Sequence, residues 1–127
     1  MNTPRTITVL GVQIDLAPDE HYAGLILNAD GTPAHHLILL PGQGEKLTWS
    51  KAKKWAKEAG GELPTRRELG LLRVNADAEF ERDWFWSGEQ HAEDSDCAWF
   101  QGFGDGDQHD YYKSAQLRAR AVRRLAI

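Results

Sequence analysis

An aspartate-rich run, residues 104–110, holds the side chains whose spacing is best suited to binding a metal ion. Asp105, Asp107 and Asp110 supply three carboxylates, and the glycines beside them let the backbone turn tightly. Calcium takes roughly six to eight oxygen ligands, often from a flexible loop, so the run predicts a calcium site at these aspartates. The alternative is a polar β-turn, which favours Gly and Asp for their backbone freedom. The EF-hand pattern with its terminal Glu is absent.

The run belongs to a longer segment, residues 76–111, that carries eleven acidic side chains and one basic side chain, Arg82. The whole chain has a net charge of only −4, so its charges are strongly segregated. Such a segment repels itself unless it is solvated, paired with basic residues of the chain, or bound to a cation or a basic partner. Aromatic side chains beside it are suited to a protein interface or to stacking on a sugar.

These observations predict a partner-binding surface, and the alternative is a solvated face that the chain's own Arg and Lys partly neutralise. The residues of the predicted surface are Glu89, Glu93, Asp94, Asp96, Asp105, Asp107, Asp110, Tyr111 and Tyr112.

No arrangement typical of an enzyme is present. A Ser/His/Asp order, a phosphate-binding glycine loop and a convincing carboxylate pair are all missing. His91, His109 and Cys97 lack the short spacings of a zinc site, and the lone cysteine is better explained as a small buried hydrophobic residue. We therefore expect no catalytic activity, and no cofactor apart from the candidate calcium ion.

A basic stripe on a predicted helix offers a surface for nucleic acid, but the overall negative charge argues against that ligand. The stripe consists of Lys51, Lys53, Lys54 and Lys57, with Arg66 and Arg67 nearby. One cysteine and the absence of an apolar run long enough for a membrane helix predict a cytoplasmic protein without membrane contact.

The elements that must position these residues begin with strands. The apolar residues of 6–16 change parity at Gly11, which predicts a turn or an added residue there. Asp30-Gly31 separates the apolar runs 21–28 and 34–40, and this is a strong hairpin signal. Neither run alternates, so we expect both faces of these strands to be covered.

Two helices follow. Thr48 is the predicted N-cap of the first, which ends at a Gly-Gly pair and places Trp49 and Trp55 on one apolar stripe. Thr65 and Glu68 form a capping box at the start of the second. We expect the two tryptophans to pack in the core rather than to bind a ligand.

The chain then returns to strands, predicted at residues 84–86, 97–103, 108–113 and 117–125. The last of these alternates Leu and Ala with Arg, which predicts one buried and one exposed face. Strands, two helices and further strands are the order of an α+β protein, and the length fits a single domain over residues 1–127.

Three motifs resemble one family when they are taken in this order. They are Leu-Pro-Thr-Arg-Arg-Glu-Leu at 63–69, Trp-Ser-Gly at 86–88, and Ala-Trp at 98–99 combined with Arg-Ala-Arg-Ala-Val-Arg at 118–123. Together they are similar to the DUF1566 group of bacterial and phage proteins, whose best-known domain is the C-terminal region of the Legionella collagen-like adhesin. The resemblance covers about residues 45–125.

The resemblance implies a C-type-lectin-like fold, with two helices packed on a twisted antiparallel sheet. It places the binding surface in the loops at about residues 87–112, and the first 45 residues become an added region of strands and a hairpin. The cysteine pairs and sugar-binding calcium motifs of C-type lectins are absent, as is the cysteine pair of the related formylglycine-generating enzymes. The resemblance therefore implies a fold and gives no support for those two activities.

The sequence as a whole predicts a non-enzymatic binding module, of the phage or prophage accessory type, that binds a host protein through its acidic loops. One form of this hypothesis is inhibition of a host nucleic-acid-binding factor, with carboxylates placed where phosphates would lie. The alternative is a calcium-assisted module for a glycan or surface ligand, adhesin-like or carried on a virion. A structural subunit without a ligand is a third interpretation.

Overall fold

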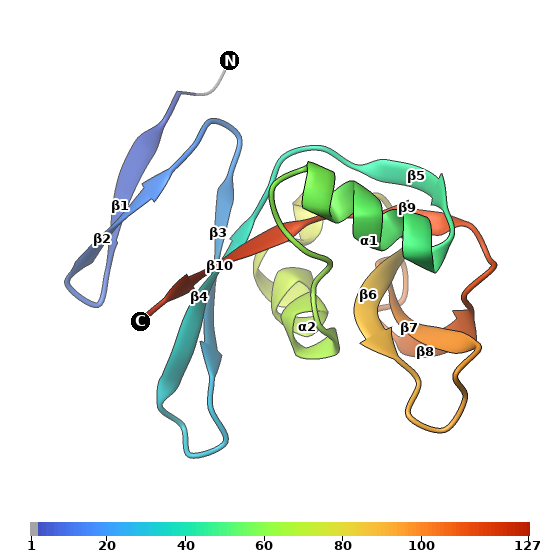
Figure 1. The fold of residues 1–127 in the computed structure, drawn as a ribbon. Helices are drawn as coiled ribbons and strands as arrows, with labels where there is room; N and C mark the ends of the chain where they lie inside the picture. Colours follow the sequence, from blue (N-terminus) through green and yellow to red (C-terminus); the bar gives the residue numbers. More distant parts are fainter. Residues whose placement is uncertain (1–2) are drawn as a thin grey trace.

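The computed structural model describes residues 3–127 and has an α+β architecture of two helices and ten strands in three sheets (Figure 1). In chain order the elements are β1 (Arg5–Val9), β2 (Val12–Leu16), β3 (His21–Leu27), β4 (Pro33–Leu39), β5 (Gly44–Leu47), α1 (Trp49–Glu58), α2 (Arg66–Asn75), a 3-10 turn (Asp77–Glu79), β6 (Trp84–Gln90), β7 (Cys97–Gly102), β8 (Gln108–Tyr112), β9 (Leu117–Ala119) and β10 (Val122–Ala126). The expected α+β class is confirmed.

The N-terminal strands form two hairpins, as the sequence predicts. β1 and β2 are joined by a tight turn at Leu10 and Gly11, which both have positive φ. This turn brings Ile7 opposite Ile14. The predicted change of parity at Gly11 is therefore a chain reversal.

The β3–β4 hairpin surrounds Asp30-Gly31, and its loop is closed by hydrogen bonds from Asn28 N to Thr32 O (2.8 Å) and from Gly31 N to Asn28 O (3.0 Å). β4 is the central strand of the sheet β10-β4-β3. As expected, both of its faces are covered: Leu37 and Leu39 join the core that contains α2, while Ile38 packs against the β1–β2 hairpin.

Both helices begin where their caps predict. Thr65 Oγ1 accepts a hydrogen bond from Glu68 N (3.1 Å), and the Glu68 carboxylate accepts one from Thr65 N (2.8 Å), so the capping box is present. α1 starts after Thr48, whose side chain makes no capping hydrogen bond. Beyond α1, a side chain at Gly61 would place its Cβ 2.2 Å from Val122 O, which explains why the chain after the helix needs glycine where it packs on β10.

The five-stranded sheet has the order β5-β9-β6-β7-β8 and is covered on two sides (Figure 1). α1 packs on one face through Trp49, Ala52 and Ala56, which share a core with Trp86 and Phe100. α2 packs on the other face, and its core cluster also includes residues of β3 and β4, so α2 lies between the two larger sheets. Among the described residues, no helix is long and apolar enough to cross a membrane.

Two details of this sheet differ from the expectations. The expectation is one antiparallel sheet with an added N-terminal region of strands and a hairpin; the described residues form three sheets, and β6 and β9 run parallel at their contact, Phe85 opposite Arg118. The sequence does not predict β5, because its four residues, Gly-Glu-Lys-Leu, carry no apolar alternation; the strand forms by pairing with β9, and Leu47 packs against the α1 core.

The predicted continuous strand over 117–125 is wrong. The chain leaves the five-stranded sheet after β9 and enters the three-stranded sheet at β10, with Arg120 and Ala121 between them. Arg120 is buried, against the expected exposed face. Its guanidinium donates to the carbonyls of Leu40 (2.9 Å) and Glu79, and these bonds let a charged side chain occupy the junction of the sheets.

Candidate partner-binding surface

Strands β6, β7 and β8 place a group of aromatic rings on one face of the sheet. The register sets Trp86 opposite Phe100 and Phe100 opposite His109. Directly opposed residues of antiparallel strands share a face. Trp84 stacks on Phe100 with ring centroids 4.7 Å apart, and the edge of Tyr111 meets Trp84 at 6.0 Å.

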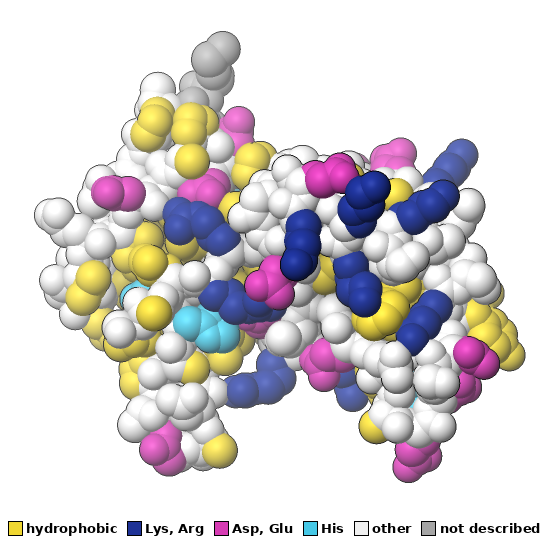
Figure 2. Space-filling model, viewed as in Figure 1, with side chains coloured by type: hydrophobic (Ala, Val, Ile, Leu, Met, Phe, Trp, Pro, Cys, Tyr) yellow, Lys and Arg dark blue, Asp and Glu magenta, His cyan; other side chains and the backbone are white. Residues whose placement is uncertain are grey.

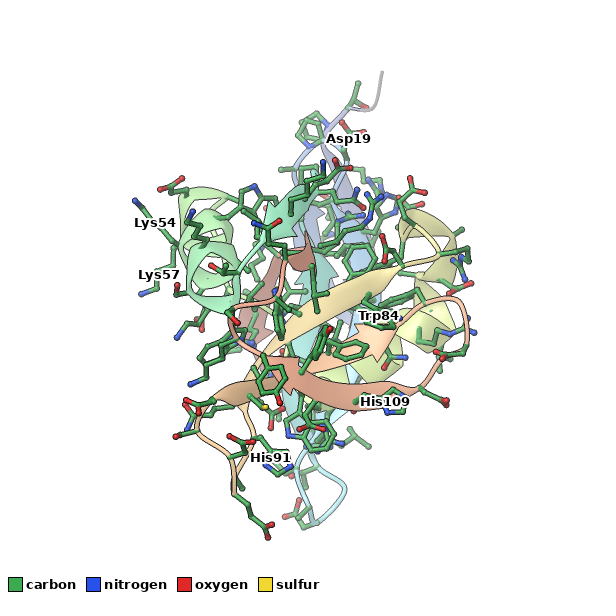
Figure 3. The ribbon with its side chains drawn as sticks, turned by 90° about the vertical axis from the view of Figure 1, so that its right-hand side faces the viewer. Asp19, Lys54, Lys57, Trp84, His91 and His109 are labelled. Atoms are coloured by element: carbon green, nitrogen blue, oxygen red, sulfur yellow. The ribbon has the colours of Figure 1, made fainter. Side chains whose placement is uncertain are left out.

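This aromatic surface, defined by Trp84, Phe100, His109 and Tyr111, is open to solvent at its edge. Trp84 is 43% exposed and Tyr111 is 41% exposed, whereas Phe100 forms the buried floor. Tyr112 continues the group at 6.0 Å from Tyr111. Figure 3 looks toward these strands, with Trp84 and His109 labelled. Large aromatic side chains exposed in contact with one another are typical of interaction sites.

Two carboxylates of the acidic segment, Asp77 and Asp83, are neutralised by arginines of the chain. Asp77 forms ion pairs with Arg73 and Arg82, and Asp83 forms one with Arg118 at 2.8 Å. The hydrogen bond from Arg82 lowers the pKa of Asp77, and the bond from Arg118 lowers the pKa of Asp83. Glu79 lies 2.8 Å from His21 Nε2. The alternative interpretation of the acidic segment, in which the chain's own Arg and Lys neutralise it, therefore holds for Asp77 and Asp83.

The carboxylates of the predicted surface behave differently. Within residues 3–127, none of them forms an ion pair with Lys or Arg, and all of them are exposed. They are Glu89, Glu93, Asp94, Asp96, Asp105, Asp107 and Asp110. The negative charge that remains without a basic partner is therefore concentrated at the β6–β7 loop, the β7–β8 turn and β8.

Two of these carboxylates also have local structural roles. Glu89 Oε2 accepts a hydrogen bond from Arg66 N (2.6 Å), the first residue of α2, where a negative charge stabilises the helix. Asp94 closes the β6–β7 loop, since it accepts hydrogen bonds from Asp96 N (3.0 Å) and from the Cys97 thiol (3.4 Å). Burial and this contact with Asp94 raise the pKa of Cys97 to about 11, so the buried thiol stays protonated at neutral pH.

The β7–β8 turn brings together a set of ligand atoms that differs from the predicted calcium set. Asp105, Asp107 and His109 each have one ligand atom within 4.8 Å of the others, whereas Asp110 lies outside this group and pairs with Trp99 in the sheet. One Asp105 oxygen is already used, because it accepts a hydrogen bond from Asp107 N (2.9 Å). Two exposed carboxylates and an imidazole offer fewer oxygens than calcium prefers.

Trp99 is covered by its own chain and is no free platform for a ligand. The Arg66 guanidinium lies 3.6 Å from the centre of its ring, and His91 stacks on the ring at 5.2 Å. Among the described residues, no cation lies over Trp84, Tyr111 or Tyr112, and Trp84 stacks only on Phe100.

Trp84 and His109 are the residues that sequence reasoning left out of the predicted surface. Trp84 is 43% exposed, whereas Trp86, two residues further along β6, is fully buried in the core that it shares with α1. A usable signal was the spacing: Trp84 begins its strand, two residues before Trp86, beside the charged residues 81–83.

A scan against models of known protein families and a search of curated proteins found no match for this chain.

Proposed function

We propose that this protein is a non-enzymatic binding module that captures a partner protein with a basic surface. The observation that carries the proposal is the position of exposed aromatic rings beside carboxylates that, among the described residues, form no ion pair with Lys or Arg. Trp84 and Tyr111 lie on the same face as His109, which adjoins Asp105 and Asp107 at the β7–β8 turn.

The two parts of this surface suit different steps of recognition. Exposed Trp and Tyr side chains bury a large area at little cost in conformational entropy, and they are enriched among the residues that dominate binding energy. The surrounding carboxylates accelerate encounter with a basic partner and fix its orientation. An Arg or Lys of the partner can contact the face of Trp84 and a carboxylate at the same time.

The fold and the biological setting of the proposal follow from the resemblance to the DUF1566 group. Two helices packed on sheets, with the loops between β6 and β8 at one side, agree in outline with a C-type-lectin-like fold. The proposed partner is a host protein of the cell that a phage or prophage occupies. A nucleic-acid-binding factor is the favoured class, because its basic surface is built to receive negative charge.

The test is affinity capture from host lysate with the tagged protein at low and high salt. Asp105→Asn combined with Asp107→Asn and Glu93→Gln should lose the captured protein, and high salt should release it from the unaltered chain. A matched control neutralises three exposed carboxylates outside the acidic segment, Asp15→Asn, Glu58→Gln and Glu62→Gln. Capture that is indifferent to the first set of changes would contradict the proposal.

A second candidate function, calcium-assisted binding of a glycan, is supported by the grouping of Asp105, Asp107 and His109 beside Trp84 and Tyr111. A sugar ring stacks on an exposed aromatic face, and an ion could bridge its hydroxyls to the carboxylates. Titration calorimetry with millimolar calcium separates the two functions: no heat and no rise in melting temperature would exclude this one.

A further inference from the structure

A pocket of about 260 Å³ lies away from the aromatic surface, between α1, β10 and the segment that leads into α2. Its walls include Lys53 and Lys57 of α1, Leu63 and Thr65 of the connecting segment, and Arg124 of β10. Figure 2 shows Lys and Arg side chains gathered over α1 and beside it. In Figure 3, Lys54 and Lys57 extend from α1 on a different side of the molecule from Trp84 and His109.

Arg124 is fixed in this pocket by a buried carboxylate. Its Nε donates to Glu68 Oε2 (2.7 Å) and its Nη2 donates to Glu68 Oε1 (2.8 Å), while Glu68 is only 1% exposed. Its Nη1 has one ion-pair partner among the described residues, the exposed carboxylate of Glu62 at 3.4 Å. One edge of the guanidinium is therefore held by the core, and the other lies on the pocket wall beside the exposed Glu62.

The two lysines add charge that the chain does not neutralise. Lys53 and Lys57 are one helical turn apart on α1, and neither forms an ion pair in the part of the chain that the structure describes. The Lys53 ammonium lies 3.9 Å from the centre of the ring of Trp49, the first residue of the same helix. Two lysines without an ion-pair partner among the described residues thus line the pocket beside Arg124, which Glu68 and Glu62 partly neutralise, and a bound anion would supply the charge that the two lysines lack.

Two neutral residues of the pocket, Thr65 and Leu63, suit it to a small anion that carries an organic group. Thr65 Oγ1 accepts the capping bond from Glu68 N and keeps its own hydrogen to donate. Leu63 supplies an apolar wall.

We propose that this pocket binds a phosphomonoester. A phosphate monoester carries close to two negative charges at neutral pH and has three terminal oxygens, which match one guanidinium and two ammonium groups better than a single carboxylate does. The ester carbons lie against Leu63. The same chemistry is presented by a free phosphorylated metabolite and by a phosphorylated side chain of a protein. The site does not depend on the aromatic surface, so either proposal can fail alone.

Calorimetry with the full chain tests the site, using glycerol phosphate and a short phosphoserine peptide as probes. Glycerol and the unphosphorylated peptide are the controls for the phosphate itself. Binding of both probes supports a site for the phosphate group, and binding of only one identifies its source. A lack of binding by both probes would overturn the proposal, as would tighter binding of a single-stranded oligonucleotide without a terminal phosphate.

Charge-matched variants locate the site on α1. Lys53→Gln with Lys57→Gln should weaken binding by about tenfold or more, because each removes a charge-assisted hydrogen bond. Lys51→Gln with Lys54→Gln removes the same charge from exposed positions outside the pocket and should change binding less than about twofold. Equal losses in the two pairs would assign binding to general charge and reject the pocket. All four lysines are exposed, so we expect the variants to fold like the unaltered chain.

Discussion

Arg124 and Glu68 form two parallel hydrogen bonds between β10 and α2, from Nε to Oε2 at 2.7 Å and from Nη2 to Oε1 at 2.8 Å. The same carboxylate accepts hydrogen bonds from Thr65 N and, with Nε2 as the donor, from His35 of β4, each at 2.8 Å. One buried carboxylate therefore joins the start of α2 to the two paired strands β4 and β10. The capping role of Glu68 was predictable, while its partners 33 and 56 residues away were not.

We expect Glu68→Gln to lower the free energy of unfolding by about 2 kcal/mol, because it removes the charge from a buried carboxylate that accepts hydrogen bonds from Arg124, Thr65 and His35. Urea denaturation monitored by tryptophan fluorescence measures the loss. Glu62→Gln is the control, since it removes the exposed partner of the same arginine and should cost far less. Equal losses in the two variants would show that burial of the pair does not matter.

The stability of the protein should also fall in acid through this carboxylate. Burial alone would raise the pKa of Glu68, but the hydrogen bonds from Arg124, Thr65 and His35 outweigh it and hold the pKa below its ordinary value of 4.5. A carboxyl whose pKa is lower in the folded state stabilises that state above the unfolded pKa, and this contribution is lost as pH falls through the folded pKa. Glu20 acts in the same direction, since the hydrogen bond from Arg123 lowers its pKa.

Unfolding midpoints in urea between about pH 7 and pH 3 check this dependence. The unaltered chain should keep a steady midpoint down to about pH 5 and lose stability below it. Glu68→Gln should show a shallower decline over the same interval, with Glu20 responsible for part of what remains. A variant that declines as steeply as the parent would remove Glu68 from the explanation.

Arg120→Ala should destabilise the protein by about 3 kcal/mol, because it leaves the carbonyls of Leu40 and Glu79 without their donor and opens a cavity between the sheets. Arg118→Ala, two residues earlier, removes ion pairs with the exposed Asp83 and Glu45 and should cost much less. Thermal and urea unfolding of the two variants compare these costs. A larger loss for Arg118→Ala would contradict the burial of Arg120.

These arginines show why the sequence predicts local elements better than their assembly. The helices, the capping box of Thr65 and Glu68, and the hairpins at Gly11 and Asp30-Gly31 depend on neighbouring residues, and they form where the pattern places them. The break between β9 and β10 depends on which sheet each half of 117–125 pairs with, and no local pattern encodes that choice. The alternation along the strand predicts that Arg120 is exposed. It is buried because two distant carbonyls accept hydrogen bonds from its guanidinium.

The candidate surface was predictable in its charge and only partly in its geometry. The carboxylates stand out in the sequence because their segment has almost no basic residues, and the structure leaves those of the loops without Lys or Arg partners. Which residues converge depends on the strand register: β8 places His109 opposite Phe100 and Asp110 opposite Trp99. Alternation along this strand therefore separates Asp110 from the group of Asp105, Asp107 and His109.

Cys97 should react with a thiol reagent about 100-fold more slowly in the native protein than in the unfolded chain at pH 8, because its pKa of about 11 leaves little thiolate. Absorbance kinetics with an aromatic disulfide, in buffer and in urea, measure the two rates. Asp94→Asn should raise the native rate, since Asp94 adds to the effect of burial on this pKa. Equal rates in buffer and in urea would show that the thiol is accessible and normally acidic.

Substitution of two tryptophans, Trp84 on β6 and Trp99 on β7, tests whether capture depends on the aromatic surface or on any large apolar side chain. Trp84→Ala should weaken capture of the partner by at least about tenfold, because Trp84 is exposed and its ring is free to be covered. Trp99→Ala is the matched control: its ring is already covered by Arg66 and His91, so the loss of capture should be small. Circular dichroism of both variants verifies folding, and binding is measured on immobilised protein with the captured partner. If Trp99→Ala weakens binding as much as Trp84→Ala, the interface lies on the opposite face of β7, where Asp110 and not His109 borders the partner.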